Sequence, residues 1–459
     1  MIGTADHKVV IERCNQFVGR TMNWIYDHLR YIPHHAPLVL CDELENRDEF
    51  PLVEARSLKV NRFSRRLWRH LMGERVYPFD AAWLRRRRPA LLHSHFGYVA
   101  LNDFELRNFL EVPWLVSFYG ADVYQQRRLE VWHEKYFHLF EQVDLTLALG
   151  PQMATQLEFL GCPKEKIVVH PLGVDLEALP SRERVLHGTA SLKILFAGTF
   201  REKKGIEYLI RGAAKARKRG VRLHVTLVGD AAEKPGDFET KESVFEEINK
   251  LGLIDSVTHL SFVRFDVLVR TALESHVFVA PSVTGADGDA EGTPFVVQQM
   301  MATGMPIITT SHSDIPYIFG QHKHQLVPER DSEAIATRLQ QYADEPERLV
   351  VDGMALRERI RTSFDVRACA ARLSEIYDAL KEKRIHPINS HGKNNMASYA
   401  IPPQCYGGGC DDFLSGQASI QNTKLRWHET PLSRIIDFVE CGSDDNLHKR
   451  PGVSLMVLP

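Results

Sequence analysis

A glutamate followed by a short glycine- and proline-containing turn stands where a strand-like apolar run gives way to a helical pattern. The run is 277–282, and the turn begins at Glu291 and extends over 292–294. Free backbone N–H groups and the positive end of a helix dipole favour an anion such as a diphosphate at this kind of junction. A glycine-rich turn that only caps an ordinary helix is the alternative interpretation. We expect a ligand site here, with Glu291 and Gln299 along one helix face.

A second candidate anion site is the segment 197–205, which lies between a strand-like run and an amphipathic helical pattern. Glycine at position 198 lets the backbone approach a ligand closely. Arg201 and Lys204 place two cations at the same turn, and a bound diphosphate needs such cations. A solvated charged turn is the alternative. We interpret Arg201 and Lys204, ahead of Lys203, as diphosphate ligands.

Two loops in the first half of the chain carry a histidine and a tyrosine directly after strand-like runs. His95 follows the run 91–93, and the group Tyr119, Gly120 and Asp122 follows the next run. Because the carboxyl ends of parallel strands meet at one edge of a sheet, we expect both loops at one site. His95 is the histidine candidate for the reaction centre, and a structural histidine is the alternative. Asp122 either orients its loop or caps the following helix.

Short apolar runs alternate with amphipathic helical patterns up to about residue 370, which is typical of parallel α/β sheets. One such helical pattern, 206–215, predicts a surface helix packed on a sheet. The predicted strands are 9–11, 38–40, 91–93, 114–118, 145–149, 167–170, 193–196, 223–228, 258–260, 277–279 and 307–310.

The chain of 459 residues is too long for one typical domain. The segment 180–191 lacks periodicity, so we interpret it as a linker between an N-terminal domain, 1–180, and a C-terminal domain, 192–365. A closing helix is predicted over 366–384. It is followed by an irregular tail, 385–459, with helical pattern only over 432–439. The fold class is α/β, with two Rossmann-like, doubly wound domains facing a central cleft.

The combined motifs resemble the retaining GT-B glycosyltransferases of family 4. The resemblance is carried by the Glu291 turn with the pattern from Gln299 to Pro306, by the 198–205 phosphate loop, and by 170–175, His-Pro-Leu-Gly-Val-Asp. The acidic insert 286–289 is similar to the exopolysaccharide branch of that family. The resemblance covers roughly 8–384. It implies transfer of a sugar, with retention, from a nucleoside-diphosphate sugar to a hydroxyl of a glycan, as a lipid-linked polysaccharide intermediate.

The resemblance also implies roles for single residues. Glu291 would bind hydroxyls of the transferred sugar. Gln299 stands where the family has a second glutamate for the ribose hydroxyls. Weaker donor binding is expected, because hydrogen bonds to charged groups contribute about 1.5–3 kcal/mol against about 0.5–1.5 for neutral ones. Tyr119 replaces a histidine that lies near the reacting sugar in the family, and it still has a hydroxyl donor. The other donor-binding residues implied are Gly198, Thr199, Gly229, Arg264, Gly292, Thr293, Pro294, Phe295 and Val296.

The charge and residue composition of the chain restrict the classes of partner, compartment and cofactor that we expect. A formal net charge of -2 gives no argument for a nucleic-acid partner. Seven cysteines without a secreted-type framework, and no signal-peptide pattern, indicate a reducing, cytoplasmic setting. No apolar stretch reaches the roughly 18–20 residues that span a bilayer, so membrane contact is expected to be peripheral. The spacing of Cys and His predicts no metal site, and we expect activity without metal or cofactor.

The segment 56–88 is rich in Arg and Lys, with an apolar stripe at Val60, Phe63, Leu67 and Leu71. Such a helix either packs on the domain by its stripe or docks on an anionic membrane surface. We expect it to be a peripheral contact with the inner face of the cytoplasmic membrane.

A second hypothesis is a degenerate GT-B subunit that binds or scaffolds in a polysaccharide assembly complex without catalysis. Gln299, Tyr119 and Tyr317 motivate it, because they depart from the family pattern. Donor binding discriminates between the two hypotheses. A GT-B epimerase or phosphorylase has less support, because no pyridoxal-lysine motif is present.

Overall fold

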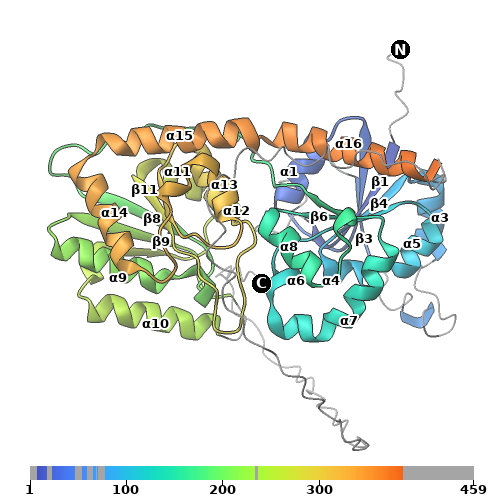
Figure 1. Cartoon of the computed structure of the whole chain (residues 1–459), viewed down its shortest axis with the longest axis horizontal. Helices are drawn as coiled ribbons and strands as arrows, with labels where there is room; N and C mark the ends of the chain where they lie inside the picture. Colours follow the sequence, from blue (N-terminus) through green and yellow to red (C-terminus); the bar gives the residue numbers. More distant parts are fainter. Residues whose placement is uncertain are drawn as a thin grey trace, which may run out of the picture. The chain divides into compact units, whose positions relative to one another are not determined.

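The computed structural model describes residues 8–17, 23–46, 54–58, 66–68, 70, 78–232 and 236–385. Two parallel β-sheets, each flanked by helices, make up this part of the chain (Figure 1). We call the described residues from Lys8 to Val169 the N-lobe and those from Leu192 to Ser363 the C-lobe. The predicted class, two doubly wound α/β units, is confirmed.

The N-lobe sheet has seven parallel strands in the order β3-β2-β1-β4-β5-β6-β7. Successive side chains of a strand point to opposite faces of the sheet, so helices must bury the apolar side chains on both faces. Val10 packs with Ile376 of the last helix, whereas Ile11 packs on the other side with Tyr136. The strands are β1 (Lys8–Phe17), β2 (His35–Leu44), β3 (Glu54–Ser57), β4 (Leu91–His95), β5 (Trp114–Ser117), β6 (Leu145–Ala148) and β7 (Ile167–Val169).

The helices of the N-lobe lie between these strands in the sequence. They are α1 (Asn23–Tyr31), α3 (Pro78–Arg87), α4 (Gly97–Ala100), α5 (Phe104–Leu110), α6 (Ala121–Tyr124), α7 (Gln126–Gln142), α8 (Pro151–Phe159) and the 3-10 turn η1 (Lys164–Lys166).

The C-lobe sheet has five parallel strands in the order β10-β9-β8-β11-β12. Its strands are β8 (Leu192–Ala197), β9 (Leu223–Val228), β10 (Val257–Leu260), β11 (Val277–Ala280) and β12 (Ile307–Thr309). Its helices are α9 (Ile206–Lys218), α10 (Asp237–Lys250), α11 (Phe265–Glu274), α12 (Phe295–Ala302), α13 (Ile315–Phe319), α14 (Ser332–Asp344) and α15 (Glu347–Ser363), with the 3-10 turns η2 (Glu202–Lys204), η3 (Ile254–Ser256) and η4 (Gly320–Gln325).

The strand order reverses once in each sheet. In the N-lobe the reversal lies between β1 and β4, and in the C-lobe between β8 and β11. Loops that leave the carboxyl ends of strands on the two sides of such a point diverge, and ligands of open α/β sheets bind between them. His95 is the last residue of β4, and the loops after β8 and β11 carry Lys204 and Glu291.

All eleven predicted strands are present, and their observed bounds differ from the predicted ones by at most several residues. The helix predicted from residue 206 is α9, and its residues Ile206, Leu209 and Ala213 are buried. The edge strand β3 was not predicted. It has four residues, Glu54 to Ser57, of which two are charged and none is fully buried, so it lacks the apolar signal of the others.

The segment 180–191 connects the lobes without helix or strand, as its composition predicted. Arg184 within it is 2% exposed and donates to the backbone oxygen of Ala272 and to the Thr303 hydroxyl. Beyond α15, helix α16 (Val366–Ile385) packs on the N-lobe sheet through Leu373 and Tyr377 (Figure 1). The chain therefore returns to its first lobe after completing the second.

A carboxylate of the C-lobe caps a helix of the N-lobe. Asp314, directly before α13, accepts the backbone N–H of Gln152 at 2.7 Å and of Met153 at 3.0 Å, at the start of α8. A Cβ atom on Gly150 would lie 2.3 Å from Cγ of Asp314. Glycine at position 150 is thus required for this contact between the lobes.

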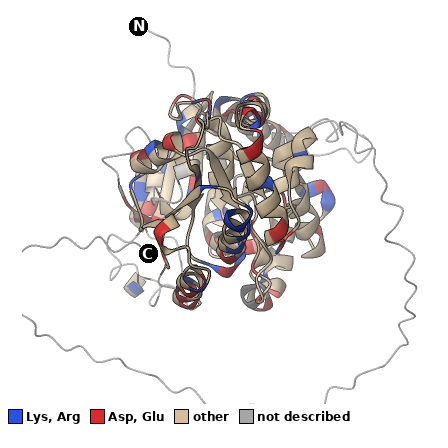
Figure 2. Ribbon diagram, turned by 90° about the vertical axis from the view of Figure 1, so that its left-hand side faces the viewer, with Lys and Arg blue, Asp and Glu red and all other residues tan. Residues whose placement is uncertain are grey.

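Basic and acidic residues alternate along the ribbon of the helices, as the colours of Figure 2 show. This distribution agrees with the small net charge. None of the described helices has the length and apolarity needed to cross a membrane. Of the predicted segment 56–88, the structure describes 56–58, 66–68, 70 and 78–88, so Val60, Phe63 and Leu71 of its stripe lie outside the described residues. Leu67 of the stripe is 47% exposed. The tail prediction for 386–459 also lies outside them.

Candidate active site

The loops after β8 and β11 bring a lysine and a glutamate together. Nζ of Lys204 lies 3.0 Å from Oε1 of Glu291, and both side chains are largely buried. The two residues are far apart in sequence, but β8 and β11 are neighbours in the sheet. The structure thus joins a predicted diphosphate ligand and the predicted sugar-binding carboxylate at the reversal point of the C-lobe sheet.

Charge keeps Glu291 ionised despite its burial. Burial would raise the pKa of this carboxyl, but the ammonium groups of Lys203 and Lys204 outweigh it and lower the pKa to about 2. Lys203 also pairs with Asp289 at 3.1 Å and donates to the backbone oxygen of Ala290 at 3.1 Å. Lys203 therefore anchors the acidic insert and also lies 3.7 Å from Oε1 of Glu291, farther than Lys204.

Two residues that sequence reasoning missed hold the backbone of Glu291. Its N–H donates to Nε2 of His312 at 3.1 Å, and Nδ1 of His312 lies 2.6 Å from Oε1 of Glu329. His312 follows β12, the strand beside β11. A histidine directly after a predicted strand was the available signal.

Arg201 takes a different direction from Lys204. Its Nε lies 3.3 Å from Oδ2 of Asp237, which begins α10. The side chain remains partly exposed, at 19% of its surface. The structure therefore places Arg201 in the same loop as Lys204, but pairs it with a carboxylate outside the Glu291 turn.

Two glycine turns close the carboxyl ends of β8 and β9. Gly229 has φ of +118°, and a Cβ atom on it would lie 2.1 Å from the backbone oxygen of Gly198. Only glycine fits that approach. Thr199, the next residue, is half-buried beside this turn.

The predicted helix starts after Pro294, which precedes the first residue of α12, Phe295. Glu291 lies four positions before the helix, so the expectation that it shares a helix face with Gln299 was wrong; the Gly292–Pro294 turn intervenes. The Thr293 hydroxyl is buried and has no hydrogen-bond partner among the described residues. Val296 and Gln299 follow on α12, with Gln299 8% exposed.

Arg264 lies apart from these groups. It precedes α11, its side chain is 73% exposed, and its Nε lies 3.0 Å from Oδ1 of Asp266. The structure thus places Arg264 on the surface near the end of β10 and pairs it with Asp266.

The N-lobe loop 118–124 is built around Asp122. This carboxylate accepts the backbone N–H groups of Gly97, Tyr119 and Gly120 at 2.8, 3.0 and 2.9 Å. Of the two alternatives for Asp122, loop orientation is the one observed. Burial raises the pKa of this carboxyl, and the three N–H donors oppose that effect.

This loop touches the Glu291 turn of the C-lobe. A Cβ atom on Gly292 would lie 2.8 Å from the backbone oxygen of Tyr119, and one on Gly120 would lie 3.2 Å from the backbone nitrogen of Gly292. The ring of Trp24 lies 6.1 Å from that of Tyr119 and 6.0 Å from that of Phe295. The predicted acceptor loop and the predicted donor turn are therefore neighbours.

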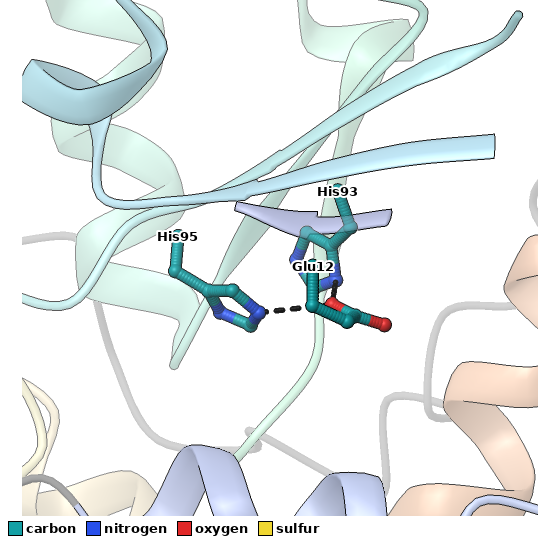
Figure 3. Close-up of side chains that lie close together, drawn as sticks. All are labelled: Glu12, His93 and His95. Atoms are coloured by element: carbon teal, nitrogen blue, oxygen red, sulfur yellow. Dashed lines mark hydrogen bonds and ion pairs between the residues drawn. The ribbon is translucent and has the colours of Figure 1, made fainter. Parts of the chain in front are cut away.

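His95 lies behind Tyr119 in a buried polar group, shown in Figure 3 with Glu12 and His93. Nδ1 of His95 lies 2.6 Å from the Tyr119 hydroxyl, and its Nε2 lies 3.0 Å from Oε2 of Glu12. Sequence reasoning missed Glu12, although it directly follows the predicted strand 9–11. It also predicted no metal site. Among the described residues, Glu12, His93 and His95 form a group whose types and spacing could hold one.

Known families match both lobes. A family model described as "Glycosyltransferase Family 4" matches residues 33–178, and one described as "Glycosyl transferases group 1" matches 191–345. The amylovoran biosynthesis glycosyltransferase AmsK of Erwinia amylovora is 30% identical over 290 residues, covering 62% of this chain and 69% of AmsK. WcaL of Escherichia coli K12, provisionally assigned as a colanic acid biosynthesis glycosyltransferase, is 30% identical over 291 residues, covering 62% and 70%.

Solved structures share the fold. HepE of Anabaena, solved with UDP and glucose, superposes with a TM-score of 0.64 at 16% identity, covering 81% of this chain and 99% of HepE. Sucrose-phosphate synthase of Thermosynechococcus elongatus gives 0.63 at 18% identity, covering 81% and 99%.

The two lobes and these relatives define a glycosyltransferase of the GT-B class. Within that class, the chain belongs to the group 1 glycosyltransferases, in the exopolysaccharide branch that includes AmsK. It is thus a glycosyltransferase of polysaccharide biosynthesis.

Proposed function

We propose that this chain transfers a hexose-type sugar, with retention at the anomeric carbon, from a nucleoside-diphosphate sugar to a hydroxyl of a lipid-linked glycan. The observation that carries the proposal is the pairing of Lys204 with Glu291 at 3.0 Å, beside the start of α12. A cation, a sugar-binding carboxylate and the N–H groups of a helix start then lie together at the end of the C-lobe sheet.

The main electrostatic task in this reaction is to stabilise the departing diphosphate. Lys204 supplies one positive charge, and the N–H groups of Phe295 and Val296 supply partial charges. Arg201 breaks its ion pair with Asp237 and joins them, which requires the movement of one partly exposed side chain. When the diphosphate takes up Lys204, Glu291 is released to accept hydrogen bonds from sugar hydroxyls.

The donor class is supported by neighbours in fold and by the residues present. HepE was solved with UDP-glucose. In this chain the buried Thr293 hydroxyl, without a partner among the described residues, offers a donor to an anionic ligand at the same turn. A glycan acceptor is supported by AmsK and WcaL, whose names assign them to polysaccharides.

The proposed reaction uses lysine and arginine, rather than a metal, to neutralise the diphosphate. We also propose a cytoplasmic location, with peripheral contact at the membrane. Phe79, Arg86 and Arg88 support this contact, because all three are exposed on or beside α3. Arg85 and Arg87 instead lie over the rings of Phe109 and Trp83.

The test is a transfer assay with purified protein, UDP-, GDP- and ADP-sugars, and lipid-linked oligosaccharides, each with and without EDTA. We expect transfer from one donor class, an unchanged anomeric configuration in the product by NMR, and no effect of EDTA. Donor binding without transfer to any acceptor would instead support the non-catalytic subunit. Inversion would contradict the proposed stereochemistry, and loss of activity in EDTA would contradict metal independence.

A further inference from the structure

The last described helix places a tyrosine hydroxyl inside the N-lobe. Tyr377 of α16 is 1% exposed, and its hydroxyl lies 3.0 Å from Oε1 of Glu12 and 2.7 Å from Nδ1 of His93. Glu12 stands on β1, 365 positions earlier in the chain. Tyr377 thus links the end of the described chain to the strand edge that carries His95.

The hydrogen bonds around Glu12 determine where the protons lie. Burial would raise the pKa of Glu12, but the charge and hydrogen bonds of His93 and His95 outweigh it and lower the pKa to about 2. An ionised carboxylate only accepts hydrogen bonds. At neutral pH the Tyr377 hydroxyl therefore donates to Oε1, and Nε2–H of His95 donates to Oε2.

This arrangement selects one tautomer of His95. Burial, together with the charge of His93, lowers the pKa of His95 to about 4, so its ring is neutral at pH 7. With the proton on Nε2, Nδ1 has a free lone pair. It accepts the O–H of Tyr119 across 2.6 Å. The only proton of the Tyr119 hydroxyl is then directed away from the Glu291 turn.

We propose that Tyr377 is a positioning residue for sugar transfer: through Glu12 it fixes the tautomer of His95, so that Tyr119 offers an oxygen lone pair to a hydroxyl of the bound sugar. The inference rests on the proposed function, because a sugar must lie beside Tyr119. The contact of the Tyr119 backbone with Gly292 supports that placement. Tyr119 thereby accepts a hydrogen bond at this position instead of donating one.

The position of Tyr377 explains why its hydroxyl has this effect. Without it, Oε1 of Glu12 loses a donor in a buried site, and the ionised carboxylate is free to turn toward Nδ1 of His93, which lies 3.1 Å from Oε2. The hydrogen bond that Nε2–H of His95 donates to Oε2 then weakens, so the ring can adopt the other tautomer. Tyr119 would then receive a proton from Nδ1 and present its own O–H to the sugar.

A metal ion is the competing occupant of the same atoms. Glu12, His93 and His95 are ligand types that zinc accepts. However, both nitrogens of each ring already have partners within the described structure: His93 contacts Tyr377 and the Ser117 hydroxyl, and His95 contacts Tyr119 and Glu12. A proton network satisfies every one of these atoms, so we assign protons to the group.

Tyr377→Phe tests the proposal, with Tyr342→Phe as the matched control. Tyr342 is also a fully buried tyrosine, and its hydroxyl donates to a carboxylate, Asp352, at 2.9 Å, but it lies in the C-lobe. Both variants lose a tyrosine–carboxylate hydrogen bond and should lose similar thermal stability. We expect kcat to fall about tenfold in Tyr377→Phe, with the donor KM changed less than about twofold, and neither to change in the control.

15N NMR of the full chain without substrate measures which of the two ring nitrogens of His95 is protonated. We expect the Nε2–H tautomer in the wild type and in Tyr342→Phe, and a mixture of tautomers in Tyr377→Phe. A wild-type His95 that is doubly protonated or Nδ1–H at pH 7.5 would overturn the proposal, as would an unchanged kcat in Tyr377→Phe. One equivalent of zinc in the purified protein, lost in Glu12→Gln, would also overturn it.

If the wild type transfers no sugar, the proposed function fails, and the tautomer measurement alone decides the hydrogen-bond arrangement.

Discussion

Nζ of Lys204 lies 3.0 Å from Oε1 of Glu291, across the point where the C-lobe strand order reverses. The pair has no net charge, and burial strengthens its attraction. A diphosphate that enters this site competes with Glu291 for the same ammonium group. Donor binding therefore exchanges an internal ion pair for one with the ligand, and it frees the carboxylate at the place where the sugar is attached.

Arg201→Ala should lower turnover by about a hundredfold, because the departing diphosphate loses a cation. Arg201 is paired with Asp237 in the ligand-free protein, so the loss should appear in kcat more than in overall stability. Steady-state kinetics and thermal melts measure the two effects. Arg270→Ala is the control, since Arg270 is also paired with an aspartate, Asp266, on the exposed side of α11. Turnover equal to the wild type would remove Arg201 from the mechanism.

Gln299→Glu should tighten nucleotide binding about fivefold, because a charged acceptor for the ribose hydroxyls replaces a neutral one. Isothermal titration with the nucleoside diphosphate that binds best measures the change. The same nucleotide without its ribose hydroxyls is the control and should show no gain. An equal gain with both nucleotides would mean that position 299 does not contact the ribose.

The contact between Asp314 and α8 should make stability depend on pH. Burial raises the pKa of Asp314 from 3.8 to about 6, against the two N–H donors. The folded state then binds the proton more tightly than the unfolded state. This contribution is fully present below pH 3.8 and is lost as the pH rises through about 6, a change of about 3 kcal/mol.

Asp314→Asn removes this titration and retains an oxygen that accepts N–H. The free energy of unfolding of the wild type, relative to that of the variant, should therefore decrease between pH 4 and pH 7. Urea denaturation at a series of pH values measures the difference. The surface variant Asp255→Asn serves as the control for loss of an aspartate. A wild-type and Asp314→Asn pair with parallel pH profiles would show that Asp314 does not titrate in this range.

Several parts of this structure could be predicted from sequence because their signals are local. Buried parallel strands are continuous apolar runs, so eleven of twelve strands were found, and only the short, polar β3 was missed. Lys204 and Glu291 could each be named as site residues in advance because each follows a strand-like run, although their ion pair was not predicted. Their meeting then requires only that those strands be neighbours.

The network around His95 could not be predicted in the same way. Tyr377 falls on the apolar stripe of α16, where a tyrosine is typical of plain core packing. Glu12 lies in the middle of β1, beside Arg13, where a charged pair is typical of a solvated strand end. Only tertiary contact between β1 and α16 reveals their hydrogen bond. The pairing of Arg201 with Asp237 likewise depends on where α10 begins, which the sequence pattern does not determine.

Arg86→Glu with Arg88→Glu should reduce binding to vesicles that contain anionic lipid, because exposed basic residues beside Phe79 are attracted to such surfaces. Vesicle flotation measures the bound fraction. Lys218→Glu with Lys250→Glu, exposed residues on the C-lobe, is the charge-matched control. Equal binding by both double variants and the wild type would contradict docking through α3.

Calorimetric titration of nucleoside-diphosphate sugars into the wild type and into Lys204→Met tests the central claim most directly. Lys215→Met, which removes an exposed lysine paired with Glu333, is the control. We predict that one donor class binds the wild type and the control equally, and that Lys204→Met loses at least about tenfold in affinity. Unchanged donor affinity in Lys204→Met would contradict a diphosphate site at the Lys204–Glu291 pair.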